Sequence, residues 1–266
     1  MRYIFIFICA LIVFDGCSSV KAVLAMGRST DDFLTLKQEP RIKYEEGSEQ
    51  LANEVVPYLE SAVKRIEAKQ SNFPKPVVVY VTGSMESFSS FCASKAPSAC
   101  VVGERLFISP KLLHTKKRIP GILTHELSHL QLTQYVGLWN YQTHIPIWFK
   151  EGLAVYISNG SGAEGVSDRE AYKAILQGKT LHPNGTGALV FRKTASSFGL
   201  DTHMFYRQSE LFVKWLHDTN PNAFRRIFVL LKEGKTVDEA VLSLYGVDVW
   251  GRWRKFYDTI KQEMQQ

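Results

Sequence analysis

Residues 124–132, THELSHLQL, contain two histidines four positions apart, with a glutamate directly after the first. On an α-helix, residues i and i+4 lie on the same face, so His125 and His129 can bind one metal ion through their imidazole rings. Glu126 is rotated by about 100° from His125, which places its carboxylate beside such an ion, where a general base is needed. Two histidines and a glutamate are costly to bury in a largely apolar helix unless they coordinate something. The segment therefore predicts a metal-binding helix.

A catalytic zinc site needs a third protein ligand and one open coordination position. The spacing H-x-x-G-x-x-H, which supplies a third histidine in one group of zinc peptidases, is absent here. Leu132 and Tyr135 occupy the positions of its glycine and its last histidine. Two candidate ligands remain downstream, His144 and Glu151.

Chain geometry favours Glu151 over His144 as the third ligand. If the first helix ends near Gly137, about eight residues carry the chain roughly 12 Å beyond His129. Pro146 suits the first turn of a second helix, and an antiparallel helix from there climbs back about 8 Å by Glu151. His144 would lie in the turn itself, at the far end from the histidines. We therefore expect Glu151 to complete the site.

The segments HELSH (125–129) and PIWFKEGLAVY (146–156) resemble the gluzincin metallopeptidases, in particular the small exported bacterial group called peptidase MA-like. In that group, an H-E-x-x-H helix is followed about twenty residues later by a W-x-x-E-G helix that supplies the third ligand. The resemblance implies a zincin-like fold.

The same resemblance assigns roles to individual residues. It implies one Zn²⁺ per chain, held by His125, His129 and Glu151, with Glu126 as the catalytic residue. One position departs from the pattern. Thermolysin has an acidic residue four positions after its glutamate ligand, where it orients a histidine, and here that position is Val155. The groups that orient the ligands therefore have to come from elsewhere in the chain.

The implied reaction is zinc-assisted hydrolysis of a peptide or protein substrate, in which Glu126 takes a proton from water and delivers it to the leaving amine. The tetrahedral oxyanion needs a further donor. Tyr206 is the first candidate, since the segment 206–218 is similar to a Y-x-x-S helix of the same group, and His203 is the second. Two alternatives stay open: a zinc hydrolase of a non-peptide amide such as a cell-wall fragment, and a non-catalytic envelope-anchored binding or scaffold protein. The intact Glu126 argues against the scaffold.

The N-terminus predicts export. After Met1 and Arg2, the apolar run YIFIFICALIVF (3–14) is too short for a membrane span, which needs about 20 residues. A short basic start with a short apolar run is typical of a signal peptide, here over residues 1–22. The stretch FDGCSS (14–19) resembles a lipobox, which would place a lipid anchor on Cys17. Cleavage after Ala22 or Ala25 would instead release a soluble protein.

Export changes what the four cysteines can do. Cys9 is lost with the signal peptide, and Cys17 is either removed or lipidated. Cys92 and Cys100 remain as an even pair in an oxidising compartment, which predicts a disulfide bond between them.

The order of hydrophobic patterns predicts an α+β fold. The segment 76–82 is a β-branched run and predicts a buried strand, and the segment 101–109 predicts a second strand. A helix with a kink at Pro57 precedes them, and helical patterns dominate after them. We expect a small N-terminal sheet followed by a mainly helical C-terminal part, in a single catalytic domain over residues 46–266. Residues 23–45 are expected to form a tether that ends in an edge segment.

Two further classes of function are excluded by pattern. The net charge is +6, but the basic residues are spread along the chain and form no nucleic-acid-binding motif. Residues 160–165 match G-x-G-x-x-G, yet no strand precedes them, as a dinucleotide site requires. This glycine-rich stretch is expected to be a helix stop followed by a loop.

Overall fold

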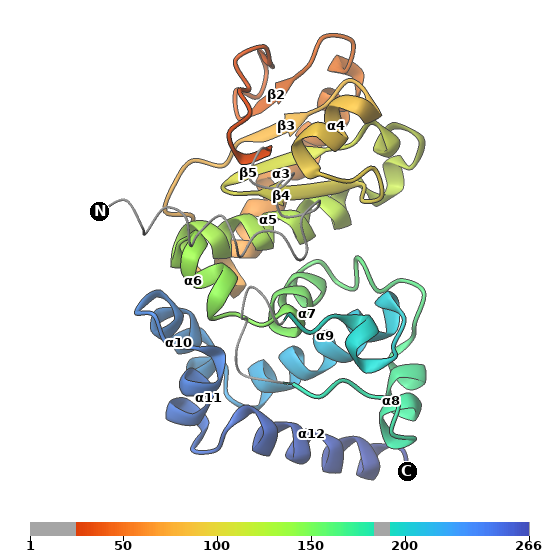
Figure 1. The fold of residues 1–266 in the computed structure, drawn as a ribbon, viewed down its shortest axis with the longest axis vertical. Helices are drawn as coiled ribbons and strands as arrows, with labels where there is room; N and C mark the ends of the chain where they lie inside the picture. The colour runs from red at the N-terminus through yellow and green to blue at the C-terminus, as the bar shows by residue number, and fades with distance from the viewer. Residues whose placement is uncertain (1–24, 184–191, 266) are drawn as a thin grey trace, which may run out of the picture. The chain divides into compact units, whose positions relative to one another are not determined.

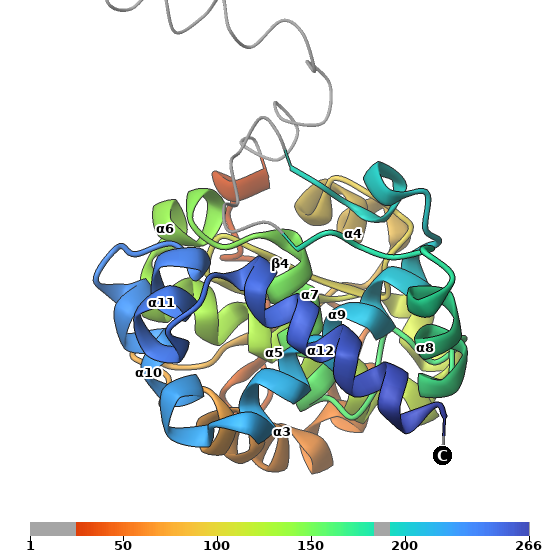
Figure 2. The ribbon, with the colours of Figure 1, turned by 90° about the horizontal axis from the view of Figure 1, so that it is seen from below.

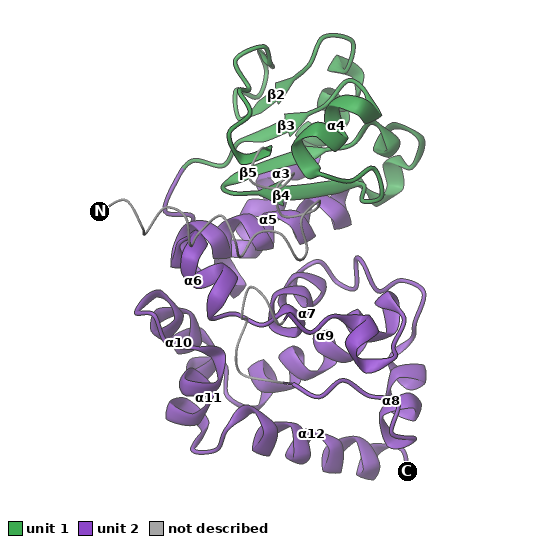
Figure 3. Ribbon diagram, viewed as in Figure 1, with its two compact units in different colours: residues 1–57, 76–119 green, residues 58–75, 120–266 purple. Residues whose placement is uncertain are grey.

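The computed structural model describes residues 25–183 and 192–265 (Figure 1). The predicted signal peptide and the lipid anchor at Cys17 lie outside the described residues. The chain divides into two compact units, which Figure 3 shows in different colours. Unit 1 comprises Met1–Pro57 and Pro76–Ile119, and unit 2 comprises Tyr58–Lys75 and Pro120–Gln266. The single domain expected over 46–266 stays a prediction.

Unit 1 is built on a five-stranded sheet with the strand order β1-β2-β3-β5-β4. The strands are β1 (Leu34–Thr35), β2 (Ile42–Tyr44), β3 (Val79–Val81), β4 (Ala99–Val102) and β5 (Arg105–Ile108). β2, β3 and β5 are parallel, and the two edge strands pair antiparallel with their neighbours. Residues 23–45, expected to form a tether with an edge segment, thus supply the edge strand β1 and also β2 inside the sheet.

The segment 101–109, predicted as one strand, forms part of a hairpin. β4 and β5 pair antiparallel, with Val102 opposite Arg105. Gly103 in the turn has φ 62°, a left-handed conformation that glycine adopts without steric cost. The prediction of a single strand was wrong because a two-residue turn divides the apolar segment into two strands that pair with each other.

An aromatic cluster fills the space between the sheet and helix α4 (Met85–Cys92), which lies over one face of the sheet in Figure 1. Phe91 of α4 stacks on Phe107 of β5 with ring centroids 4.5 Å apart. The predicted disulfide is confirmed: Cys92, the last residue of α4, is bonded to Cys100 of β4. The bond therefore joins the helix to the edge strand of the sheet.

Helices make up most of the remaining described chain. The α-helices are α3 (Glu49–Lys69), α5 (Ile119–Val136), α6 (Leu138–Thr143), α7 (Ile147–Ile157), α8 (Asp168–Leu176), α9 (Thr202–Thr219), α10 (Pro221–Lys232), α11 (Val237–Tyr245) and α12 (Val249–Glu263); short 3₁₀ turns are η1 (Pro110–His114), η2 (Lys116–Arg118) and η3 (Ala195–Phe198). α3 continues through Pro57 without a break. Among the described helices, none combines the length and the apolar character of a membrane span. The α+β prediction, with strands first and helices later, is confirmed.

The core of unit 2 is formed by α7, α9 and α12. Trp148 of α7 packs on Phe212 of α9 with ring centroids 5.3 Å apart. Trp253 and Phe256 of α12 contact the same Phe212 ring at 4.9 and 5.5 Å, and α12 lies in front of α9 in Figure 2. These buried aromatic contacts fix the two helices, α7 and α9, that carry part of the site described below.

Local sequence signals explain where several helices begin and end. The capping box of Thr236 and Glu239 is present at the start of α11, as its spacing predicted. Gly234, with φ 88°, follows the end of α10. The first metal-motif helix ends at Val136, next to Gly137, as expected. The short helix α6 that follows was expected to be only a turn.

Candidate metal centre

Helix α5 presents the first two candidate ligands on one face. The Nε2 atoms of His125 and His129 lie 3.2 Å apart, and both side chains are almost fully buried. The spacing of four residues places the two imidazoles one turn apart on the same face, with ring centroids 4.9 Å apart and planes inclined by 73°. A bound metal ion could therefore be reached by both Nε2 atoms at once.

Glu151 of α7 completes this group. Its Oε2 atom lies 3.4 Å from Nε2 of His125 and 3.6 Å from Nε2 of His129. One ligand atom from each of the three residues lies within 4.8 Å of the others. His144, the other candidate, is at the end of α6, where its Nδ1 lies 2.7 Å from the Thr143 hydroxyl. The structure therefore brings Glu151, and not His144, to the two histidines.

The three residues fit a zinc ion on the chemistry of their donor atoms. Oε2 of Glu151 is buried and has no hydrogen-bond partner among the described residues. A buried carboxylate oxygen without a partner is costly, and a cation between it and the two imidazoles would remove that cost. Two imidazole nitrogens and one carboxylate oxygen form a ligand set that zinc takes in catalytic sites, with a fourth position left for water.

The electrostatics of the centre favour positive charge between these groups. Burial raises the pKa of Glu151, but the imidazoles of His129 and His125 outweigh it and hold that pKa well below the usual range. Burial lowers the pKa of His125, yet the carboxylates of Glu151 and Glu126 raise it on balance. The pKa of Glu126 differs from that of Glu151 in its net direction. Desolvation raises the pKa of Glu126, and the imidazoles of His125 and His129 lower it by less. A carboxyl group with a raised pKa accepts a proton more readily than an ordinary one.

Gly152, directly after Glu151, explains how α7 comes so close to α9. A Cβ atom at this position would lie 2.5 Å from the backbone oxygen of Ser209. Only glycine permits this approach of two helix backbones. The glycine of the W-x-x-E-G motif thus sets the spacing between the helix that carries Glu151 and the helix that carries Tyr206.

Tyr206 of α9 lies in this group of residues. Its ring is nearly parallel to that of His125, with centroids 6.3 Å apart. Burial raises its pKa, and the nearby carboxylate of Glu151 raises it further, so the phenol keeps its proton. His203, the second candidate for an oxyanion donor, accepts a hydrogen bond at Nδ1 from the backbone N–H of Gly165. The structure therefore places Tyr206 against the candidate ligands and gives His203 a contact with the loop after α7.

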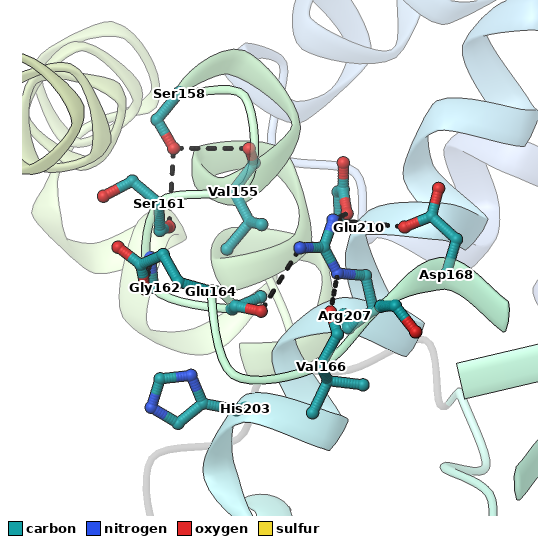
Figure 4. A network of polar contacts seen from close by, with 12 residues as sticks. Val155, Ser158, Ser161, Gly162, Glu164, Val166, Asp168, His203, Arg207 and Glu210 are labelled. Carbon is teal, nitrogen blue, oxygen red and sulfur yellow. Dashed lines mark hydrogen bonds and ion pairs between the residues drawn. The ribbon is translucent and has the colours of Figure 1, made fainter. Parts of the chain in front are cut away.

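The loop after α7, residues 158–166, contacts the first histidine; Figure 4 shows Ser161 and Gly162 of this loop. The carbonyl oxygen of Ser161 lies 2.9 Å from Nδ1 of His125. Gly162, with φ 98°, passes so close that an added Cβ would lie 3.3 Å from both the His125 ring and the Tyr206 ring. The glycine-rich match at 160–165 is a loop, as expected, and it packs directly against the candidate metal centre.

Arg207 of α9 holds this loop in place. Its Nε donates to the carbonyl of Val166 at 2.9 Å and its guanidinium also donates to the carbonyl of Ala163 at 3.2 Å (Figure 4). The guanidinium pairs with Glu210 at 2.6 Å, and both side chains are largely buried. A charge-assisted network of this kind is rigid. It links α9 to the loop whose Ser161 carbonyl contacts His125.

Sequence reasoning did not find the groups that contact the outer nitrogens of the two histidines. For His125 this group is the Ser161 backbone carbonyl, which has no residue-type signature. For His129 it is the phenol of Tyr141, at 3.2 Å from Nδ1. The repeated glycines at 160–165 were the available signal for the first, because they indicate close backbone approach.

One helix carries H-E-x-x-H and a second helix carries a downstream glutamate, and their side chains meet. This arrangement is a gluzincin-type centre in a zincin-like fold. The sequence matches the Peptidase MA superfamily over residues 107–262, which is more than half of the chain, and the protein belongs to that superfamily. In a comparison with curated proteins, no match was found.

Solved structures of a yeast enzyme share the fold. LTA4 hydrolase from yeast in complex with bestatin has a TM-score of 0.51 and 15% identity, over 88% of this chain and 37% of that enzyme. The native yeast enzyme gives a TM-score of 0.51 at 13% identity, over 87% and 38%. Native leukotriene A4 hydrolase from Saccharomyces cerevisiae gives 0.50 at 15%, with the same coverage. The present chain thus spans little more than a third of that enzyme's length.

Proposed function

We propose that this protein is a zinc-dependent metallopeptidase that hydrolyses peptide bonds in the cell envelope or outside the cell. One observation carries the proposal: His125, His129 and Glu151 present three ligand atoms within 4.8 Å of one another, and Glu126 follows the first histidine on the same helix. Membership of the Peptidase MA superfamily supports the same reaction class.

Each residue of the centre has a distinct task in this proposal. When bound, zinc supplies a Lewis acid that polarises the scissile carbonyl and lowers the pKa of a water molecule. The carboxylate of Glu126 accepts a proton from that water and then delivers it to the leaving nitrogen. The raised pKa of Glu126 suits the first step, because a carboxylate with a raised pKa accepts a proton more readily than an ordinary one.

Tyr206 is the candidate that stabilises the developing oxyanion. Its phenol stays protonated, because burial and nearby carboxylates raise its pKa, and it can therefore donate a hydrogen bond. It stands beside the His125 ring on the well-packed helix α9. A donor on a rigid element needs no rearrangement when the negative charge forms.

We also propose that the protein is exported, either anchored by a lipid on Cys17 or released in a soluble form after cleavage. The apolar run at residues 3–14 and the lipobox-like sequence at 14–19 support this location. The Cys92–Cys100 disulfide supports an oxidising compartment. Mass analysis of the mature N-terminus tests the proposal. A diacylglyceryl group on Cys17 means an anchored protein, a start at Val23 or Met26 means a soluble one, and retention of Met1 in exported protein would refute export by this route.

Activity profiling tests the reaction. The zinc-loaded protein is incubated with a peptide library and with a library of cell-wall fragments, and the Glu126→Gln variant serves as the control. Cleavage of peptides by the parent alone supports the peptidase. Cleavage of wall-fragment amides alone would replace it with a non-peptide amidase, and no cleavage of either class would favour a binding or scaffold protein.

A further inference from the structure

The outer nitrogen of His129 has a side-chain partner. Its Nε2 faces His125 and Glu151, while its Nδ1 lies 3.2 Å from the hydroxyl of Tyr141. A neutral imidazole that binds a metal through Nε2 carries its proton on Nδ1, and the group at Nδ1 fixes both the tautomer and the ring plane. In this arrangement the phenol oxygen of Tyr141 accepts the Nδ1–H bond.

Tyr141 reaches His129 because α5 is followed by a second, short helix. Gly137, with φ 83°, separates α5 from α6 and permits the change of direction that a residue with a side chain would resist. α6 then carries Tyr141, 12 residues after His129, back to the imidazole. Lys150 of α7 lies over the Tyr141 ring, with Nζ 4.1 Å from its centroid. The ring is therefore held from its face while its hydroxyl contacts the histidine.

The surrounding hydrogen bonds admit a consistent order of protons. The Thr133 hydroxyl, one turn after His129 on α5, donates to the His129 carbonyl at 2.8 Å. The phenol of Tyr141 can accept from His129 Nδ1–H, because burial raises its pKa and the phenol stays neutral. The backbone carbonyl and the outer ring nitrogen of His129 therefore each have a hydroxyl partner.

We propose that Tyr141 is a positioning residue that holds the imidazole of His129 in the tautomer and orientation needed to bind the metal ion. The inference rests on the proposed function, since it takes His129 as a zinc ligand. Thermolysin orients a histidine with an acidic residue at the position that Val155 occupies here, so this chain needs another orienting group. Here the orienting group for His129 is a neutral phenol from a different helix.

The chain contains a closely matched control for this tyrosine. The Tyr156 hydroxyl lies 3.2 Å from Nδ1 of His217, and Lys69 Nζ lies 4.0 Å from the Tyr156 ring centroid. In the same way, the Tyr141 hydroxyl lies 3.2 Å from Nδ1 of His129, and Lys150 Nζ lies 4.1 Å from the Tyr141 ring centroid. The histidine differs in role, because His217 is not part of the candidate metal centre. The Tyr156 hydroxyl also accepts a hydrogen bond from Lys69 Nζ at 2.8 Å, so the control loses at least as many contacts as the Tyr141 variant.

The test compares the zinc affinity of the full-length parent, Tyr141→Phe and Tyr156→Phe. Each substitution removes one oxygen and keeps the ring. Apoproteins are prepared with a chelator, their thermal midpoints are recorded, and zinc is titrated in competition with a chromophoric chelator. We expect zinc to bind about 10- to 100-fold more weakly to Tyr141→Phe, because loss of an outer partner of a metal ligand has effects of this size. Tyr156→Phe should bind zinc within about twofold of the parent.

The remaining outcomes would overturn the positioning role of Tyr141, the proposed peptidase function, or both. If Tyr141→Phe binds zinc as tightly as the parent, or if Tyr156→Phe weakens binding equally, Tyr141 only fills space and the inference is wrong. A parent that shows the expected affinity pattern but cleaves no amide would support the role of Tyr141 and overturn the proposed function. A parent that binds no zinc would overturn both.

Discussion

The Nδ1 atom of His125 lies 2.9 Å from the carbonyl oxygen of Ser161, a residue 36 positions later in the chain. This contact sets the ring so that its Nε2 faces Glu151. A backbone carbonyl can only accept, so His125 has to carry its proton on Nδ1, which leaves Nε2 free to bind a metal ion. The glycine-rich loop therefore belongs to the surroundings of the candidate metal centre, because its backbone sets the tautomer of His125.

Replacement of Gly162 by alanine should weaken zinc binding by about tenfold, because the loop orients a metal ligand. The added Cβ would lie 3.3 Å from the His125 ring, and φ 98° strains any residue with a side chain. Gly178→Ala is the control, since Gly178 has φ 79° but open space around its Cβ position. Both variants should lose about 1 to 2 kcal/mol of stability from backbone strain, as measured by urea unfolding. Equal zinc affinity in the two would mean that the loop does not orient His125.

Gly152→Ala should disturb the helix that carries Glu151. Its Cβ would lie 2.5 Å from the backbone oxygen of Ser209, and a backbone atom cannot move aside as a side chain can. Overpacking of this kind typically costs about 1 to 3 kcal/mol, occasionally more. We expect both a lower free energy of unfolding and weaker zinc binding. A variant with the stability and zinc affinity of the parent would show that the two helices do not need this close approach.

Cys92 and Cys100 should resist alkylation in exported, folded protein unless a reductant is added, and mass spectrometry of the alkylated protein measures this. Replacement of both by alanine should lower the free energy of unfolding by about 2 to 3 kcal/mol, because the bond closes a short loop. The bond joins α4 to β4 in unit 1, so zinc affinity should not change. Labelling of both thiols without reductant would contradict the prediction.

The grouping of His125, His129 and Glu151 could be predicted from the sequence, whereas the groups around them could not. His125 and His129 follow from helix periodicity alone, and Glu151 follows from the length of chain available to return to them. Ser161 contributes only its backbone, which no residue pattern marks. Tyr141 was missed because the segment after Gly137 was expected to turn without forming the helix that aims this side chain. Contacts made through tertiary structure leave little trace in local sequence.

The last prediction separates the two glutamates of the centre. Glu151→Ala removes one of three candidate ligands, so zinc should be lost and activity with it. Glu126→Gln keeps the size and polarity of the side chain but cannot accept a proton. It should therefore retain zinc and lose about 10²- to 10⁴-fold in rate.

Metal content by emission spectrometry and turnover are measured on the same preparations of both variants, with His144→Ala as the control that should change neither. His144 is a suitable control because its Nδ1 is engaged by Thr143 at the end of α6, and it is not among the residues that approach one another at the centre. If Glu151→Ala kept stoichiometric zinc while His144→Ala lost it, the ligand assignment would be wrong. Full turnover by Glu126→Gln would remove the general base from the mechanism and, with it, the argument for a peptidase of this type.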